Sequence, residues 1–407
     1  MMQRILAAVS ILALAAACSP KPAEIASPAA IAPGPEAYSQ LQTRLIEAKP
    51  GEVIEIGAGT FEFTDGLSLD VDNVTLKGAS QGETILSFAG QTGAGEGLLV
   101  TSDGVTVSDF TMQDSKGDGI KSKGADGITF KNLTVEWTGG PKAENGAYGV
   151  YPVESKNVLI DGVTVRGASD AGIYVGQSDR IIVRNSRAEF NVAGIEIENS
   201  SNADVHDNVS THNTGGILVF DLPDLPVMGG HSTRVFNNTI VENDTPNFAP
   251  PGNIVANVPM GAGLMMMANR NVHVFGNTFD KNATAHILIY AYSFPFTDTR
   301  YNPLPRDFVI RDNTYGEGGY NPQGRMAPFA AATGGSLPDI VWDGITSYGD
   351  KTEDVRVVVR EPADVSYVNL GLGVTPIDPA RAKPSMTRQP DAEIAEPAAV
   401  ELPMQGA

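Results

Sequence analysis

The chain has 407 residues, 42% of them hydrophobic, and a formal net charge of −20 at pH 7. Such acidity argues against a nucleic-acid-binding protein and against electrostatic docking to anionic lipid, because both partners carry negative charge. The length suits two or three average domains or one elongated repeat fold, so composition alone leaves the architecture open.

The first residues have the pattern of an export signal. Arg4 supplies a positive charge, an apolar run follows from Ile5 to Ala17, and small residues lead into Cys18, the single cysteine of the chain. We therefore expect a signal peptide over residues 1–17. The pattern resembles a bacterial lipoprotein signal, with Cys18 as the lipidation site. Because Leu14 lies one place too far from the cysteine, an ordinary export signal is the alternative.

Composition and repeats divide the rest of the chain into four segments. Residues 18–34, rich in Pro and Ala, are expected to form a tether, and residues 35–348 contain the repeats. Residues 349–374 are expected to supply C-terminal cap strands. Residues 375–407, rich in Pro, Ala and acidic residues, are expected to be a disordered tail.

Self-similarity in the central segment predicts a solenoid. Seven ten-residue blocks of alternating apolar residues align, with starts 23, 30, 23, 22, 30 and 39 residues apart. A basic unit of 22 or 23 residues is the length of one turn of a three-stranded β-helix. The blocks begin at Val105, Ile128, Val158, Ile181, Ala203, Thr233 and Val272. Between them lies a second series of short strands, beginning at Gly119, Gly149, Gly172, Gly194, Gly216, Gly263 and His286.

Asparagine recurs at two fixed positions of the repeat. Identical amides on successive coils can hydrogen-bond along the solenoid axis, so the sequence predicts two asparagine ladders. The first contains Asn208, Asn238, Asn277 and Asn313, and the second contains Asn191, Asn213, Asn243 and Asn282.

These blocks resemble the right-handed parallel β-helix proteins of the pectate-lyase-like superfamily, especially its carbohydrate-binding and sugar-hydrolysis repeat subgroup. The resemblance covers about residues 36–348. It implies an all-β fold, a right-handed single-stranded parallel β-helix of about ten coils. The segment Leu41–Phe63 is similar to the superfamily's opening helix and first coil, which implies an N-terminal capping helix.

The resemblance also implies where the working face lies. Family active sites usually occupy the outer face of the first strand of each coil, which is the Gly-led series here. Its outward side chains are predicted to form a groove with a polar N-terminal half and an apolar C-terminal half beneath the loop of residues 245–261. The first outward position gives Lys121, Tyr151, Tyr174, Glu196, Leu218, Met265 and Leu288, and the next gives Lys123, Val153, Gly176, Glu198, Phe220, Met267 and Tyr290.

Tyrosine and charged side chains suit a sugar site, which needs a flat apolar surface with polar groups beside it. A surface glutamate without a role is the alternative interpretation of Glu196. The candidate catalytic residues are Lys121, Tyr174 and Glu196. The predicted substrate-binding residues are Lys121, Tyr151, Glu154, Tyr174, Glu196 and Glu198.

If the protein is an enzyme, the resemblance favours a uronate lyase or C5-epimerase over a glycoside hydrolase. The segment Tyr148–Glu154 is similar to a motif of the mannuronan C5-epimerases, but Tyr151 and Val153 stand where that motif has an aspartate and a histidine. For hydrolysis, Glu196 and Glu198 are a candidate carboxylate pair.

A metal site is the third alternative. Met265, Met267 and His273 offer thioether and imidazole groups that suit copper, and a copper-maturation protein of the nitrous-oxide reductase system carries similar repeats. Core packing of the methionines is the competing interpretation. We expect no resident cofactor, with calcium and copper left open.

The favoured hypothesis is therefore a lipid-anchored protein of the bacterial envelope. It is expected to face the periplasm, from the outer membrane, and to bind a polysaccharide or envelope glycan along the first-strand groove. Similar repeat lipoproteins are often encoded beside a c-type-cytochrome-like exported protein, which implies a protein partner as well.

Overall fold

The computed structural model describes residues 29–93, 95–332, 334–349, 351–375, 380 and 382–403. The expected signal peptide and Cys18 lie outside the described residues, as does the first part of the expected tether. Within the described part of the chain, no helix has the length and apolar character needed to cross a membrane.

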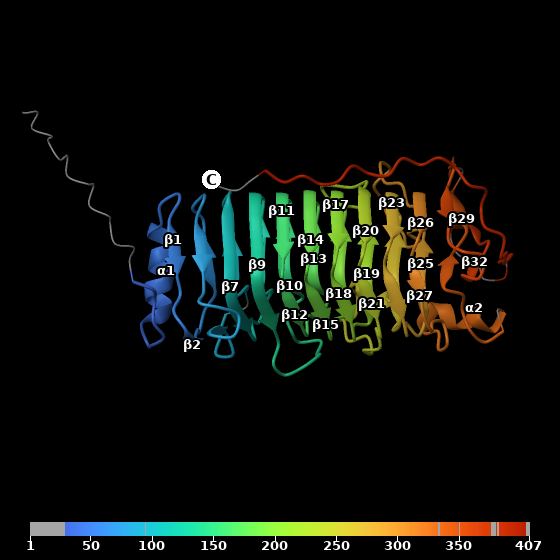
Figure 1. Ribbon diagram of the computed structural model, residues 1–407. Coiled ribbons are helices and arrows are strands. Elements are labelled where there is room, and N and C mark those ends of the chain that lie inside the picture. The colour runs from blue at the N-terminus through green and yellow to red at the C-terminus, as the bar shows by residue number, and fades with distance from the viewer. Residues whose placement is uncertain are drawn as a thin grey trace, which may run out of the picture.

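The chain forms a right-handed parallel β-helix, as predicted, and successive coils stack along one axis (Figure 1). The first strand of each coil adds to an 11-stranded parallel sheet. That sheet contains β3 (Leu67–Leu69), β6 (Leu98–Val100), β8 (Ile120–Lys123), β10 (Tyr148–Val153), β13 (Ala171–Gly176), β16 (Ala193–Glu198), β19 (Gly215–Phe220), β22 (Ala262–Met267), β25 (Ala285–Tyr290), β28 (Ile340–Trp342) and β32 (Tyr367–Asn369).

The second and third strands of the coils form a 19-stranded sheet, because the long strands β7 and β9 run unbroken through both positions. The second-strand series is β1 (Val53–Glu55), β4 (Thr75–Lys77), β7 (Val105–Gln113), β9 (Asp126–Glu136), β11 (Lys156–Asp161), β14 (Asp179–Arg184), β17 (Ser201–His206), β20 (His231–Phe236), β23 (Arg270–Phe275), β26 (Arg306–Arg311) and β31 (Val357–Val359). The third-strand series adds β2 (Gly59–Glu62), β5 (Thr84–Ser87), β12 (Thr164–Arg166), β15 (Arg187–Glu189), β18 (Val209–Thr211), β21 (Thr239–Val241), β24 (Thr278–Asp280) and β27 (Thr314–Tyr315).

Alternation along each strand sends one set of apolar side chains into the solenoid. Ile195 and Ile197 of β16 stack on Ile217 and Val219 of β19, and all four are fully buried. The coils approach so closely that a Cβ added at the strand-leading Gly194 would lie 2.5 Å from a backbone oxygen of the next coil. Glycine is therefore required there by packing.

Both predicted asparagine ladders are present, with each side-chain amide donating to the amide oxygen of the next coil. The bonds are 2.9–3.2 Å long, and the amides also donate to backbone carbonyls. The ladders satisfy polar groups at the two buried turns of the coils that contain them and so help to fix the stacking register there. The first ladder ends where Asn313 donates to Glu361 at 2.7 Å.

A helix covers the N-terminal end of the solenoid, as the resemblance implied. The helix α1 (Ala37–Glu47) buries Leu41 and Leu45 against the first coil, and the Tyr38 ring lies 5.7 Å from that of Phe63. The helix thus covers apolar core that an open terminal coil would expose.

The C-terminal end differs from the prediction of cap strands over residues 349–374. Within that segment β31 and β32 extend the two large sheets by a further coil. The reason is visible in the strand: Val357 and Val359 continue the inward apolar alternation and are buried. A small sheet lies beside this coil, formed by β29 (Ile345–Tyr348), β30 (Lys351–Thr352) and β33 (Gly373–Thr375).

The segment expected to be a disordered tail also differs, because its described residues 382–403 lie along the 19-stranded sheet (Figure 1). Glu396 pairs with Arg234 of β20 at 3.3 Å and with Arg311 of β26 at 2.8 Å, and these strands are two coils apart. Acidic residues of this terminal segment form ion pairs with arginines on the outer face of the sheet. Composition alone does not reveal these pairs.

The short helices lie in loops beside the 11-stranded sheet. The 3-10 helix η1 (Ile254–Asn257) belongs to the loop before β22. A second 3-10 turn and a short helix, η2 (Gly324–Met326) and α2 (Ala327–Ala332), follow one another before β28. Both loops carry residues that cover the outer face of this sheet.

Candidate functional site

The outward side chains of the 11-stranded sheet lie in the predicted order. Tyr151 is paired with Lys121, and Tyr174 is paired with Glu196 on the next strand. Glu196 in turn is paired with Leu218, where the apolar residues begin. We call the outer face of β8 to β16 the polar half and that of β19 to β28 the apolar half.

Three tyrosines gather in the polar half. The ring centroid of Tyr148 lies 4.4 Å from that of Tyr151 and 4.5 Å from that of Tyr174, while the last two rings meet edge-on at 4.9 Å. The ammonium group of Lys121 lies 4.8 Å from the centroid of the Tyr151 ring. Tyr174 is buried behind the other two rings, which are partly exposed. The result is an aromatic surface with a cation at its edge.

Carboxyl groups border the tyrosines. Tyr174 donates its hydroxyl proton to Glu198 at 2.6 Å, and Asp170 accepts a hydrogen bond from the Asn253 side chain at 3.0 Å. The side chain of Tyr148 lowers the pKa of Asp170 against the effect of burial. Glu196 has no exposed surface, and neither of its carboxyl oxygens has a hydrogen-bond partner in the described structure.

Burial perturbs the protonation of these carboxyl groups. It raises the pKa of Asp118 to about 6 and the pKa values of Asp170 and Glu198 to about 7. Burial, reinforced by repulsion from Glu198 and Asp170, raises the pKa of Glu196 well above its ordinary value. Groups with pKa values near neutrality are suited to proton transfer, and such perturbed groups gather at functional sites more often than elsewhere.

Residues 245–261, here called the covering loop, fold over the junction of the two halves. The side-chain amide of Asn247 donates to the backbone oxygens of Val255 and Val258, both at 2.9 Å, and so closes the loop on itself. Val258 then packs on β19, where a Cβ added at Gly215 would lie 2.8 Å from its side chain. Asn253 ties the same loop to Asp170.

The covering loop corrects the prediction of an open groove. It was expected over the apolar half alone, yet Glu196 is buried as completely as its neighbour Leu218, and Glu198 is almost as buried. In this structure neither glutamate is a surface contact for a substrate. The alternation of the strand sends these side chains outward, but the strand pattern says nothing about what packs over them.

The predicted substrate-binding residues therefore divide into three groups. Lys121, Tyr151 and Tyr174 come together as predicted, while Glu196 and Glu198 lie beneath the surface. Glu154 lies apart at the exposed rim of the sheet, 3.8 Å from Lys123.

The structure argues against Tyr174 as a general base. Burial and the neighbouring Glu198 raise its pKa well above the ordinary value of 10, and its proton is already donated to that carboxyl group. Lys121 lies 3.2 Å from Glu96 and 3.7 Å from Asp118, so its ammonium group has two acidic partners.

Sequence reasoning missed Asp118, Asp170 and Asn253 as members of this cluster. Asp118 directly precedes the strand-leading Gly119, and Asp170 lies two residues before Gly172. Acidic residues just before a first strand are a signal that could have identified these two. Asn253 lies in the covering loop, where no repeat pattern points to it.

The candidate copper ligands do not form one site. Met265 and Met267 lie on β22 of the 11-stranded sheet, whereas His273 lies on β23 of the 19-stranded sheet and contacts Asn271 at 3.1 Å. The chain leaves one sheet for the other between them, so the side chains point to different faces. Across the described ranges, no three His, Cys, Asp or Glu side chains are arranged to hold a metal ion.

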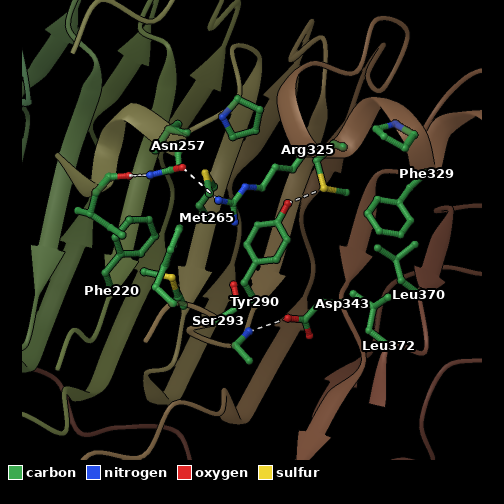
Figure 2. Close-up of a pocket in the computed structure, with 18 of the residues that line it drawn as sticks. Phe220, Asn257, Met265, Tyr290, Ser293, Arg325, Phe329, Asp343, Leu370 and Leu372 are labelled. Atoms are coloured by element: carbon green, nitrogen blue, oxygen red, sulfur yellow. Dashed lines mark hydrogen bonds between the residues drawn. The ribbon is translucent and has the colours of Figure 1, made fainter. Parts of the chain in front are cut away.

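The apolar half contains a cavity of about 560 Å³ between the covering loop and the loop that carries η2 and α2 (Figure 2). Met265, Met267 and Phe220 form part of its floor, on the same face as the tyrosine cluster. In strand register Phe220 is the neighbour of Glu198. The polar cluster and the apolar cavity thus meet across a single strand-to-strand step.

Comparisons with known proteins agree with this architecture. Residues 96–248 match the family model described as "Right handed beta helix region". No functionally curated protein sequence matches the chain. Among solved structures, the A-module of a mannuronan C-5 epimerase from Azotobacter vinelandii gives a TM-score of 0.54 at 16% identity, covering 83% of this chain and 95% of that one.

A DFA-IIIase from Arthrobacter chlorophenolicus, in a form without its lid, gives a TM-score of 0.50 at 12% identity. The match covers 83% of this chain and 97% of that one. At such identities the likeness shows the fold alone: this chain is a right-handed parallel β-helix, an architecture that it shares with these two enzymes.

Proposed function

We propose that the polar half of the first-strand face binds a carbohydrate. The observation that carries the proposal is the contact among Tyr148, Tyr151 and Tyr174, with Lys121 at its edge. The exposed parts of the first two rings suit the apolar face of a sugar, and the charged groups beside them suit its hydroxyls. The likeness to a mannuronan epimerase module supports a ligand of this class.

The charge of the site favours a neutral glycan over a uronate polymer. Lys121 faces Glu96 and Asp118 directly, Asp170 directly precedes β13, and Glu198 ends β16. These carboxyl groups outnumber the cation, and even partly ionised at neutral pH they leave a polyanion without a net positive surface to bind. This balance counts against the uronate lyase or C5-epimerase alternative.

A second candidate function, glycoside cleavage, follows from the carboxyl groups of Asp118 and Asp170. Their pKa values of about 6 and about 7 leave a mixture of protonated and ionised forms at neutral pH. A protonated carboxyl group can donate to a leaving glycosidic oxygen, while an ionised one can activate water. We assign these roles to Asp170 and Asp118 respectively.

Binding is tested with a panel of neutral and uronate-containing oligosaccharides, measured by isothermal titration calorimetry. We expect a neutral member to bind and Tyr151→Ala to weaken that binding at least tenfold. Tyr320→Ala is the matched control, because Tyr320 is exposed outside the site. Unchanged affinity in the Tyr151 variant would contradict the proposed site, and binding confined to uronates would contradict the preference for a neutral glycan.

Cleavage is tested by following new reducing ends and unsaturated products with the same panel. A hydrolase releases reducing ends without unsaturated products, and Asp170→Asn should abolish that release while leaving glycan affinity within a few fold. Unsaturated products would instead support lyase chemistry. Turnover that survives both Asp118→Asn and Asp170→Asn would exclude the assigned pair.

We also propose that the protein is exported and lipid-anchored at Cys18, facing the periplasm from the outer membrane. The support is the residue pattern of the first 18 positions. Metabolic labelling with a fatty-acid probe should modify the wild-type chain and not Cys18→Ser. Equal labelling of both chains, or a wild-type chain left unlabelled, would contradict lipidation. A protein partner remains a prediction of the family resemblance.

A further inference from the structure

The cavity in the apolar half is a built pocket outside the proposed glycan site. Its volume of about 560 Å³ lies within the range of pockets that bind small molecules. Strands β19, β22 and β25 supply the floor, and the two long loops supply the walls (Figure 2). The lining is dominated by apolar side chains, including Phe220, Met265, Met267, Met326, Leu370 and Leu372.

The lining chemistry suits a flexible apolar chain. Methionine side chains are unbranched and polarizable, so they adapt to a ligand that lacks a rigid shape. Two polar groups within the pocket are already engaged. Asp343 accepts hydrogen bonds from the backbone of Ala291 at 2.7 Å and of Ile345 at 2.9 Å, and Tyr290 donates its hydroxyl proton to Met326. The interior therefore offers few polar groups to a ligand.

One cation lies at the edge of this apolar lining. The guanidinium group of Arg325 lies 4.7 Å from the centroid of the Phe294 ring, and it donates to the side-chain oxygen of Asn257 at 3.4 Å. In Figure 2 the Arg325 side chain extends across the pocket towards Asn257. No described carboxylate forms an ion pair with it, although the chain carries a net charge of −20. Arg325 is thus available to an anionic group.

We propose that this cavity binds a single acyl chain with an anionic head group. The chain lies among the methionine, phenylalanine and leucine side chains, and the head group pairs with Arg325. This ligand site differs from the glycan site in its residues and its chemistry. Its existence therefore does not depend on the proposed carbohydrate function.

Chain-length dependence tests the apolar part of the proposal. The probes are saturated fatty acids of increasing length, below their aggregation limits, titrated into the full chain by calorimetry. Burial of each added methylene should strengthen binding about fourfold until the cavity is filled. Affinity that does not rise with length, or no binding of any probe, would overturn the proposal.

Head-group charge tests the polar part. Dodecanoate should bind at least tenfold more tightly than dodecanol or dodecylamine, and equal binding of the three would overturn the assignment of Arg325. A lysophosphatidic acid with the same chain distinguishes a phospholipid source from a free fatty acid. Whichever of dodecanoate and lysophosphatidic acid binds more tightly identifies the source of the ligand. If neither binds, the proposed site is wrong.

Two variants and two matched controls complete the test. Met267→Trp should fill the cavity and abolish binding, whereas Met386→Trp, at an exposed methionine, should leave it unchanged. Arg325→Gln should weaken anionic probes about tenfold and spare dodecanol, whereas Arg300→Gln, at an exposed arginine paired with Asp298, should spare both. Arg325 is itself exposed, so its substitution tests binding without threatening the fold. Wild-type binding in Arg325→Gln would refute the head-group contact.

Discussion

The polar and apolar halves of the first-strand face lie on different coils of the solenoid, but these coils have the same backbone pattern. Glu196 and Leu218 occupy the same position of neighbouring strands, and both are fully buried. Inward of them, the isoleucine and valine side chains are nearly interchangeable from coil to coil. The comparison teaches that the inward positions build the scaffold, while the outward positions decide what each part of the face can bind.

The two halves also differ in how well their buried groups are satisfied. Leu218 needs no hydrogen-bond partner, whereas the carboxyl oxygens of Glu196 lack one among the described residues. An unsatisfied buried carboxyl group costs stability, so a glutamate at this position indicates a requirement other than folding. A raised pKa allows Glu196 to hold a proton beside Glu198 and Asp170, which is consistent with the carbohydrate site that we propose.

Leu218→Glu would extend the polar half by one strand and should have the largest effect. It would bury a second carboxyl group beside Glu196 without a partner, at a cost of about 3–5 kcal/mol at neutral pH. Denaturant unfolding measures this change. Val227→Glu, at an exposed position, should change stability by less than about 0.5 kcal/mol. A loss below about 1 kcal/mol in the Leu218 variant would show that this position has room for solvent.

Glu196→Leu makes the reverse change and should stabilise the protein by about 1–3 kcal/mol at pH 7. The folded-state pKa of Glu196 is raised above its ordinary value of 4.5, so the penalty of the wild-type residue grows as pH rises above that value. The advantage of leucine should therefore shrink as pH falls towards 4.

Thermal and denaturant unfolding at several pH values between 4 and 7 measure this dependence. Glu196→Gln separates the two causes, because it removes the titrating group and keeps a buried polar one. A leucine variant that is less stable than the wild type at pH 7 would mean that Glu196 has a stabilising partner.

Tyr174→Phe removes the donor to Glu198 and should cost about 1.5 kcal/mol. Because that hydrogen bond lowers the pKa of Glu198 against the effect of burial, its loss should raise the pKa further above 7. Unfolding experiments and an NMR titration of labelled glutamate measure the two effects. Tyr320→Phe is the exposed control, and an unchanged Glu198 pKa in Tyr174→Phe would disprove the coupling.

Lys123→Gln should have the smallest effect. The ion pair of Lys123 with Glu154 lies at the solvent-exposed rim, where such pairs contribute at most about 1 kcal/mol. Unfolding at low and high salt measures it. A larger loss of stability would show that the ion pairs at the rim stabilise the polar half more than its buried groups do.

Much of the fold could be predicted from periodicity, because each coil repeats the same requirement. Inward apolar residues such as Ile195, strand-leading glycines such as Gly194 and the asparagine at each buried turn recur in fixed phase. The order of side chains along the first-strand face follows from the same register. The tyrosine cluster with Lys121 was predictable for this reason.

The remainder depends on segments without a repeat. Asn253 reaches Asp170 across 83 residues of sequence, and Glu396 reaches Arg234 across 162. No local sequence pattern predicts either contact, because each depends on how a long loop or the terminal segment folds back onto the coils. The extra coil at β31 was missed for a different reason, because its short apolar run was assigned to a cap.

The sequence by itself determined the parallel β-helix, its axial register and the division of one face into polar and apolar residues, because strand alternation and coil stacking are local and repetitive. Only the tertiary structure decided which of those residues solvent can reach. Glu196 is buried, which raises its pKa, and the covering loop together with the η2 and α2 loop encloses the cavity beside Arg325. Burial depends on what packs over a side chain, and in this protein that is decided by non-repeating loops.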